Sequence, residues 1–405
     1  MYRPERFWRS AVIAINRQAP LWDLAFRSFF ILASFASVFS LIVWLVYLNS
    51  GAVLTSQQLL SPVLWHIHEM FFAFTLTIAI GFLLTAVQTW TGLKSLQGAS
   101  LIGLTVIWIV IRCLLLLDQS TFPELLVLVL FLQTLWWAVV LISFSRSLLK
   151  ARSKRNYIFM PLLTTLMILQ LSFLYLSQES IDLVLHLARS AILVFSIMVG
   201  LIAGRVIPLF TRNALVPSVK EKVKATPRLD DMLIIFSLIG CLNFSLNYFV
   251  EMPFSPAWIL LLVGTLHFIR LTHWASVYTF NNPLVWSLHL SYLCLVSGLI
   301  LIAISFFTVQ VRMADAFHVI TVGVFGGMIL AMICRVSLGH TGRVLQVNKW
   351  IVLAFFSIFM AVILRVLLAL LNQPLWAWNS SALLWILAFS IFLKFYIPVL
   401  ISARN

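Results

Sequence analysis

Apolar segments separated by short polar ones cover almost the whole length of this 405-residue chain. Each apolar run is about twenty residues long, which is the length at which an α-helix crosses the hydrocarbon core of a bilayer. Dividing the chain where these runs meet charged residues, Pro or Asn predicts twelve membrane-spanning helices. The expected ranges are 26–48, 63–88, 99–117, 123–145, 157–177, 181–207, 230–250, 256–275, 283–308, 314–337, 349–371 and 379–402.

Composition supports the same fold class. Hydrophobic residues make up 62% of the chain and charged residues 10%, which excludes an ordinary soluble protein. The twelve runs leave no room for a soluble domain. We therefore predict an all-α polytopic membrane protein whose residues 1–405 form a single integral membrane domain.

The second, sixth and tenth predicted helices lie four helices apart and have similar ends. The second is followed by Trp90-Thr91-Gly92, the sixth ends in Gly204-Arg205-Val206-Ile207-Pro208, and the tenth runs into Leu338-Gly339-His340-Thr341-Gly342. This similarity predicts three pseudo-repeats of four helices. Such a repeat would bring the three helices together around one axis.

The distribution of charge predicts the orientation of the chain. A net charge of +15 can indicate a nucleic-acid partner, but Lys and Arg gather here in alternate loops. Loops 146–155 and 212–228 are basic, whereas the turn 178–182 between them is acidic. This is the positive-inside pattern of a membrane protein. It predicts that both termini are cytoplasmic and that the chain has no nucleic-acid partner.

We assign no chemical role to the cysteines or to the basic N-terminus. The apolar run that follows the N-terminus is too long for a signal-peptide core, so we expect the first helix to be retained. The N-terminal basic residues are Arg3, Arg6, Arg9 and Arg17. The cysteines lie apart in apolar runs without ligand spacing such as CxxC, and we interpret them as packing residues. They are Cys113, Cys241, Cys294 and Cys334.

Histidines gather at the predicted outer ends of the second, sixth and tenth helices. His66 and His68 open the second, His186 the sixth and His318 the tenth. Residues two apart on an α-helix differ by about 200°, so His66 and His68 should point to opposite faces and serve two different centres. Imidazole suits haem iron and copper. We therefore predict these four histidines as axial haem ligands or copper ligands.

Charged residues near these histidines are candidate supporting groups. Glu69 lies at i+3 from His66, where it would orient the imidazole or relay protons. The alternative is an ion pair with an arginine, because a buried carboxylate needs a partner. Arg112, Arg189 and Arg365 are the candidates for that pair. As ligands for haem propionates or other anions we consider Arg189, Arg312, Arg335, Arg343 and Arg205.

Two inner histidines form a weaker candidate site. His340 lies in a Gly-flanked basic segment, which fits either an anion cradle of backbone N–H groups or a turn that faces anionic lipid. His289 is compatible with a second, inner site with His340 and equally with a packing role. His267 and His273 flank Arg270 at the end of the eighth predicted helix, and we interpret both as structural.

Six motifs distributed along the chain carry a resemblance to a known family. They are Trp65-His66-Ile67-His68-Glu69-Met70, Gly81-Phe82-Leu83-Leu84-Thr85-Ala86, Trp90-Thr91-Gly92, Gly204-Arg205-Val206-Ile207-Pro208, Leu288-His289-Leu290 and Arg335-Val336-Ser337-Leu338-Gly339-His340-Thr341-Gly342-Arg343. Together they resemble the NnrS family, and the resemblance spans the whole chain. It implies a bacterial inner-membrane protein of about twelve spans that contains haem, expected to be of the b type, and copper. It also implies a link to nitric oxide metabolism or resistance.

A more distant analogy is the main subunit of haem–copper oxidases. It is similar in its twelve helices in three groups of four, and in a His-x-His helix that carries ligands for two centres. The analogy breaks at the copper site, which there draws on an adjacent His-His pair that this chain lacks. It supports the geometry more than oxygen reduction.

Three functions remain compatible with the sequence. The first is a haem protein that binds or turns over nitric oxide at His-ligated centres near the periplasmic side. As a nitric oxide-linked oxidoreductase it would need an electron donor, because the chain has no CxxCH or iron–sulfur spacing. The second is a transporter for a metal or small solute. The third is a haem-based membrane sensor.

Overall fold

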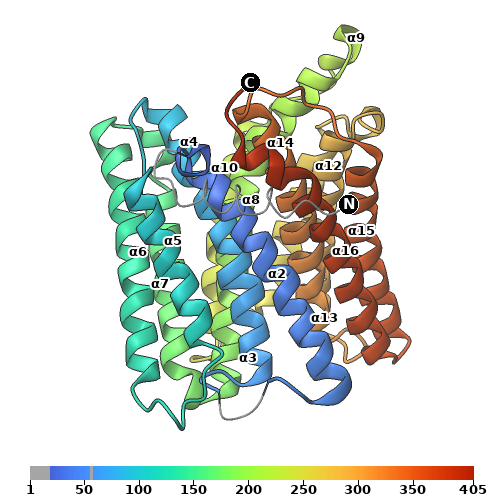
Figure 1. Cartoon of the computed structure of the whole chain (residues 1–405). Helices are drawn as coiled ribbons and strands as arrows, with labels where there is room; N and C mark the ends of the chain where they lie inside the picture. Colours follow the sequence, from blue (N-terminus) through green and yellow to red (C-terminus); the bar gives the residue numbers. More distant parts are fainter. Residues whose placement is uncertain (1–18, 55–57) are drawn as a thin grey trace. The chain divides into compact units, whose positions relative to one another are not determined.

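The computed structural model describes residues 19–54 and 58–405 and is helical throughout these ranges (Figure 1). Within them, ten helices are long and apolar enough to cross a membrane, and two shorter apolar helices accompany them. This confirms the prediction of an all-α polytopic membrane fold. Arg3, Arg6, Arg9 and Arg17 lie outside the described residues. The main elements are α2 (Ala25–Ser50), α3 (Pro62–Ile67), η2 (His68–Thr75), α4 (Leu76–Thr91), α5 (Ala99–Leu114), α6 (Leu125–Lys150), α7 (Phe159–Tyr175), α8 (Ile181–Ala214), α10 (Pro227–Leu246), α11 (Pro256–Thr272), α12 (Pro283–Ile304), α13 (Met313–His318), η6 (Val319–Gly326), α14 (Gly327–His340), α15 (Lys349–Leu370) and α16 (Pro374–Ile401).

Proline lies at two of the large differences between predicted and observed helix ends. The sixth helix was expected to stop at 207, before Pro208, but α8 continues through this proline to Ala214. Membrane helices tolerate an internal proline because neighbouring groups satisfy the freed carbonyl. The last helix begins at Pro374, five residues before the expected 379. Proline is favoured in the first turn, where its missing N–H costs nothing.

The helices form two compact units. The first contains the described residues up to Ser180 together with Val336–Val344 and Phe392–Asn405. The second contains Ile181–Arg335 and Leu345–Ile391. Helices α14 and α16 therefore contribute residues to both units.

In the first unit, α2 packs along η2 and α4, and α4 also contacts α6 (Figure 1). Consecutive helices α5, α6 and α7 are neighbours. The contact between α2 and α4 is close at Gly81, where an added Cβ would lie 2.9 Å from the Cβ of Phe29. Small residues of this kind let membrane helices approach each other.

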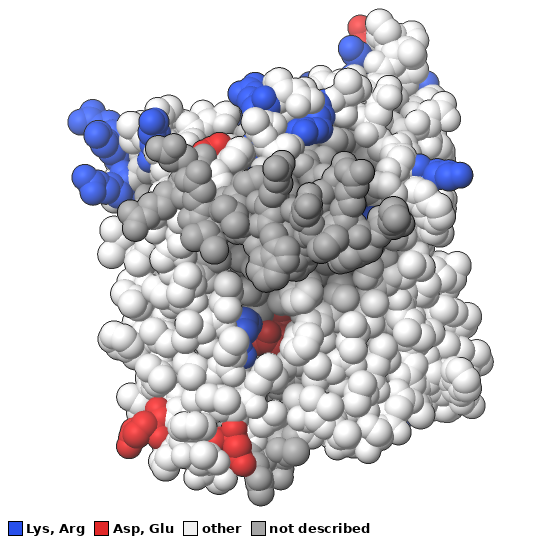
Figure 2. Space-filling model, in the orientation of Figure 1, with Lys and Arg blue, Asp and Glu red and all other residues white. Residues whose placement is uncertain are grey.

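The ends of α6 differ in charge. Glu124 precedes the helix, and the basic segment 146–155 covers its last turn and the residues that follow. Figure 2 shows basic side chains at that end, acidic side chains at the opposite end and a mostly uncharged surface between them, in which one basic and one acidic group lie side by side. This arrangement suits a helix whose middle lies in hydrocarbon and whose ends lie in the two interfaces.

In the second unit, α12 packs against α11 and η6, and η6 also contacts α15. The approach of η6 to α12 requires glycine. An added Cβ at Gly323 would lie 2.6 Å from both Cβ and Sγ of Cys294, and one at Gly327 would lie 2.6 Å from Ser291 Oγ.

Two of the spans contain a π-helical segment of the same length. Elements η2 and η6 are each eight residues long, and each follows a six-residue α-helix. The two spans also end alike, since Gly92 and Gly342 have positive φ angles of 70° and 75°. These are the second and tenth predicted helices, whereas the sixth, α8, is α-helical throughout. π-Helical segments are rare and are frequent at functional sites.

A pair of glycine variants tests the packing of α4 on α2. Gly81→Ala should lower the melting temperature of the purified protein, because overpacking a tight contact costs about 1–3 kcal/mol. Gly103→Ala on α5 is the matched control, since no atom lies within 4 Å of its added Cβ. It should leave the melting temperature unchanged or raise it. Equal effects of the two substitutions would contradict the packing described.

Candidate functional site

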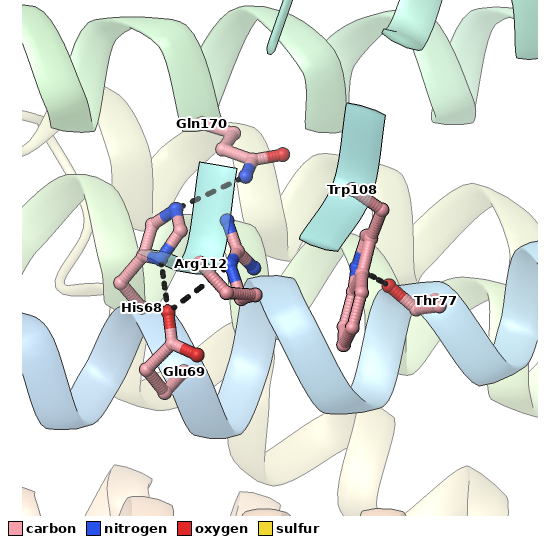
Figure 3. A network of polar contacts seen from close by, with 6 residues as sticks. All are labelled: His68, Glu69, Thr77, Trp108, Arg112 and Gln170. Atoms are coloured by element: carbon pink, nitrogen blue, oxygen red, sulfur yellow. Dashed lines mark hydrogen bonds and ion pairs between the residues drawn. The ribbon is translucent and has the colours of Figure 1, made fainter. Parts of the chain in front are cut away.

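The candidate site in the first unit is centred on His68, the first residue of η2. Its side chain is fully buried, with 0% exposure. Nδ1 lies 3.1 Å from Oε1 of Glu69, and Nε2 lies 3.2 Å from the side-chain nitrogen of Gln170 on α7 (Figure 3). Thr75 Oγ1 donates to Met70 O, five residues earlier, over 3.0 Å. This bond follows the π-helical register.

The hydrogen bonds define the tautomer of His68. Trp137 Nε1 lies 2.7 Å from Oε1 of Gln170, and an indole N–H can only donate. The amide of Gln170 must therefore present its NH₂ group to His68, so His68 Nε2 accepts. The ring hydrogen is then on Nδ1, which donates to the Glu69 carboxylate. A carboxylate that holds Nδ1–H fixes the ring with its lone pair on Nε2, which is the arrangement of a metal-binding histidine, although this lone pair accepts from Gln170 here.

The carboxylate of Glu69 pairs with Arg112 of α5. Arg112 Nε lies 3.5 Å from Glu69 Oε1, whereas Arg365, another of the three predicted partners, pairs with Asp315 instead. Two buried nitrogens of Arg112, Nε and Nη2, have no hydrogen-bond partner among the described residues. Unpaired buried guanidinium nitrogens are costly. Arg112 therefore retains capacity to bind an anionic or polar group.

The side chain of Arg112 packs against the ring of Trp108. The guanidinium carbon of Arg112 lies 5.4 Å from the centre of the Trp108 ring, within the range of a cation–π contact. Trp108 Nε1 donates to Thr77 Oγ1 of α4 over 2.8 Å (Figure 3). The indole is thus held by the same span that carries Glu69.

His66 and His68 contact different helices. The ring of His66 stacks on Trp44 of α2, with centroids 4.4 Å apart and an interplanar angle of 18°. His68 instead reaches Gln170 of α7. Each histidine therefore has its own surroundings, as two separate centres would need.

A similar group of side chains lies in the second unit around His318, the last residue of α13. Its Nδ1 lies 2.7 Å from the backbone oxygen of Ala314, which can only accept, so the ring hydrogen is on Nδ1. Arg365 Nη2 also lies 3.5 Å from this Nδ1, but two donors cannot share a hydrogen bond, and the shorter contact decides. Arg365 Nη1 binds Asp315 Oδ1 over 2.6 Å.

The two groups of side chains share one plan. Each places a histidine at a junction between α- and π-helix, with a carboxylate on the same span and an arginine from the helix that follows this span in the chain. In both, the histidine is protonated on Nδ1. The second and tenth predicted helices are therefore alike in local chemistry as well as in helix type.

His186 is held differently. Its Nε2 lies 3.0 Å from the backbone oxygen of Ser245, which places the hydrogen on Nε2 and the lone pair on Nδ1. The ring lies against Phe244 and Tyr248 of the second unit, at centroid distances of 5.1 and 4.8 Å.

The two inner histidines have separate partners. His289 contacts Thr211 Oγ1 at Nε2 and Ser276 Oγ at Nδ1, both over 2.8 Å. Since both ring nitrogens are engaged, a metal would have to displace a hydroxyl. His340 lies 5.5 Å from the ring of Phe26, at a tilted angle.

The predicted anion ligands have varied surroundings. The guanidinium carbon of Arg335 lies 3.7 Å from the ring centre of Phe210. Arg343 Nη2 donates to Ser402 Oγ over 2.8 Å. Arg312 caps the start of α13 through its backbone oxygen, which accepts from two N–H groups. The remaining candidates, Arg189 and Arg205, both lie on α8.

No group of three or more His, Cys, Asp or Glu side chains that could hold a metal ion occurs within residues 19–54 and 58–405. A haem places fewer demands on the protein, because its porphyrin supplies four nitrogens and the chain adds one or two axial ligands.

Sequence reasoning missed Gln170 and Trp137, which set the tautomer of His68. Gln170 offered a signal, because it is a lone amide within the apolar run 157–177, and polar groups inside a span usually bind across helices. Trp137 offered none, since it is one of fifteen tryptophans.

Removal of Arg112 tests the ion pair. Arg112→Gln leaves the Glu69 carboxylate buried without its cation, and breaking one side of a buried pair costs about 3–5 kcal/mol. The melting temperature of the purified protein should fall, and adding Glu69→Gln should restore part of it. Arg146→Gln, at an exposed position, is the control and should have little effect. An Arg112→Gln protein as stable as the parent would show that the pair is not formed.

Comparison with known proteins identifies the family of this chain. The model of the family described as NnrS protein matches residues 20–404. Comparison with curated proteins gives no match. The match covers nearly the whole chain and includes every motif quoted above, so this protein belongs to the NnrS family.

Proposed function

We propose that this protein holds haem and copper within the membrane and handles nitric oxide there, by binding, detoxification or redox turnover. The observation that carries the proposal is the fully buried His68, whose Nε2 lone pair is presented by the Nδ1–H bond to Glu69. Membership of the NnrS family supports it.

His68 and His318 are the first choices as metal ligands, because both donate from Nδ1, which makes Nε2 the nitrogen that would form a coordinate bond. To bind a metal, His68 would exchange its hydrogen bond from Gln170 for a coordinate bond. His66 and His186 are the further candidates for haem or copper. His289 and His340 rank lower, His289 because hydroxyl groups, and not a carboxylate, hold its ring.

Supporting roles follow from charge. Glu69 would orient His68 and could accept a proton, since it lies between an imidazole and a guanidinium. Arg189, Arg312, Arg335, Arg343 and Arg205 remain the candidates for haem propionates or other anions. Haem iron bound through these histidines would supply the site at which a gas binds or changes redox state.

The chemistry of the ligand agrees with a buried site. Nitric oxide is small and neutral and partitions into the bilayer, so it reaches an intramembrane centre without a polar channel. Turnover would also require electrons from a partner, because the sequence has no CxxCH or iron–sulfur motif.

Substitution of the two histidines tests the proposal. The purified protein should show a Soret band that shifts with nitric oxide, and His68→Ala or His318→Ala should abolish or alter it. His273→Ala is the control, because this exposed histidine only donates to the Ile269 carbonyl. Haem and copper content should be measured in parallel. An unchanged spectrum in both variants, or protein-dependent copper uptake without tightly bound haem, would favour the transporter instead.

We also propose a bacterial inner-membrane location with both termini in the cytoplasm. In a Cys113→Ser background, which removes the exposed native thiol, Glu124→Cys should react with an impermeant maleimide in intact spheroplasts. Lys154→Cys, at the opposite end of α6, should react only after the membrane is opened. The reverse pattern would invert the orientation.

A further inference from the structure

A small cavity lies inside the second unit, apart from His318 and its ion pair. Its volume is about 20 Å³, enough for one water molecule or a ligand of similar size. Most of the lining is aliphatic, from helices α8, α10, α11 and α12. The polar groups that line it belong to His267, Cys241, Ser196 and Ser237.

A buried polar network holds His267 at this cavity. Its Nδ1 lies 2.5 Å from the hydroxyl of Tyr292, and the same hydroxyl oxygen accepts from Arg270 Nε over 2.7 Å. Arg270 also donates to Asp230 Oδ1 over 3.0 Å and to the Gly200 carbonyl over 2.7 Å. Because the arginine is paired with a carboxylate, the network is neutral overall.

The donors in this network fix the tautomer of His267. A guanidinium nitrogen can only donate, so the oxygen of Tyr292 accepts from Arg270. The buried hydroxyl hydrogen needs an acceptor, and His267 Nδ1 is the one that the described contacts provide. Nδ1 therefore carries the lone pair, and the ring hydrogen lies on Nε2.

The Nε2–H group of His267 lacks a hydrogen-bond partner among the described residues, although only 4% of the residue is exposed. The opposite nitrogen is engaged by Tyr292, which leaves Nε2–H as the group that can bind a molecule in the cavity lined by His267. A donor without a partner is unfavourable. Buried polar groups of this kind usually bind an ordered molecule.

Two glycines of α8 make room for the network. An added Cβ at Gly200 would lie 3.1 Å from Cε1 of His267, and one at Gly204 would lie 2.7 Å from Nη1 of Arg270. These residues are four apart, so they lie on the same face of the helix. The close approach of α8 to this polar group therefore depends on both positions.

We propose that the cavity binds one small neutral molecule that accepts a hydrogen bond from His267 Nε2–H. Water is an acceptor of this kind, and a dissolved diatomic gas, which accepts a hydrogen bond far more weakly, is of similar size. The aliphatic lining and the neutralised arginine disfavour an ion. The site needs no metal and does not depend on His68 or His318, so it extends the proposed function without resting on it.

Nuclear magnetic resonance of the ¹⁵N-histidine-labelled protein in lipid nanodiscs tests the proposal. Under argon, a bound water should give a cross-peak to the Nε2–H proton of His267. Under dioxygen, used as a paramagnetic gas probe, this signal should lose intensity reversibly if a gas enters. His267→Gln assigns the signal. Neither a water cross-peak nor a loss of intensity would overturn the proposal.

A substitution that fills the cavity can be compared with one that adds the same side chain outside it. Val263→Phe adds volume at the lining of the cavity, whereas Leu262→Phe adds it at a 40% exposed position on the same helix. The water or gas effect should disappear in the first variant and persist in the second. Persistence in both would overturn the assignment to this cavity.

The tautomer provides a readout that survives if Val263→Phe does not fold. The ¹⁵N shifts of the parent protein should show hydrogen on Nε2 of His267, and Tyr292→Phe should allow the other tautomer. Hydrogen on Nδ1 in the parent would remove the donor from the cavity and overturn the proposal.

Discussion

The structure depends on one constraint, which is that a charged or polar group inside a span must find its partner within the protein. Glu69 meets this requirement through Arg112 and His68, and Asp315 through Arg365. Each pair joins a π-containing span to the helix that follows it in the chain. The ion pairs therefore position helices as well as neutralise charge, and Glu69 also holds the ring of His68.

The fold class follows from hydrophobic pattern, because a span must be about twenty apolar residues long whatever its neighbours. The partner of Glu69 does not follow in the same way. Three arginines satisfied the sequence argument equally, and only the packing of α5 beside η2 and α4 selected Arg112. Helix ends near proline could not be predicted from the sequence either, because Pro208 lies inside a helix and Pro374 begins one.

The π-helical segments show a further limit of sequence reasoning. The angle expected between His66 and His68 assumed a regular α-helix, but the π-helix begins at His68 itself. Nothing in the composition of His68–Thr75 distinguishes it from an α-helix. Val319–Gly326 adopts the same form with different residues. The common feature is position along the span, which supports a relationship between the second and tenth predicted helices that α8 does not share.

Ring tautomers separate the histidines by chemistry more sharply than depth in the membrane does. His68 and His318 donate from Nδ1, whereas His186 donates from Nε2. His267 has an engaged Nδ1 and keeps its Nε2–H for a ligand. A metal requires a lone pair, and a neutral acceptor requires a hydrogen. The same side chain can therefore serve as a metal ligand at one position and as a hydrogen-bond donor at another. The neighbouring Glu, Gln and Tyr residues determine which role each histidine takes.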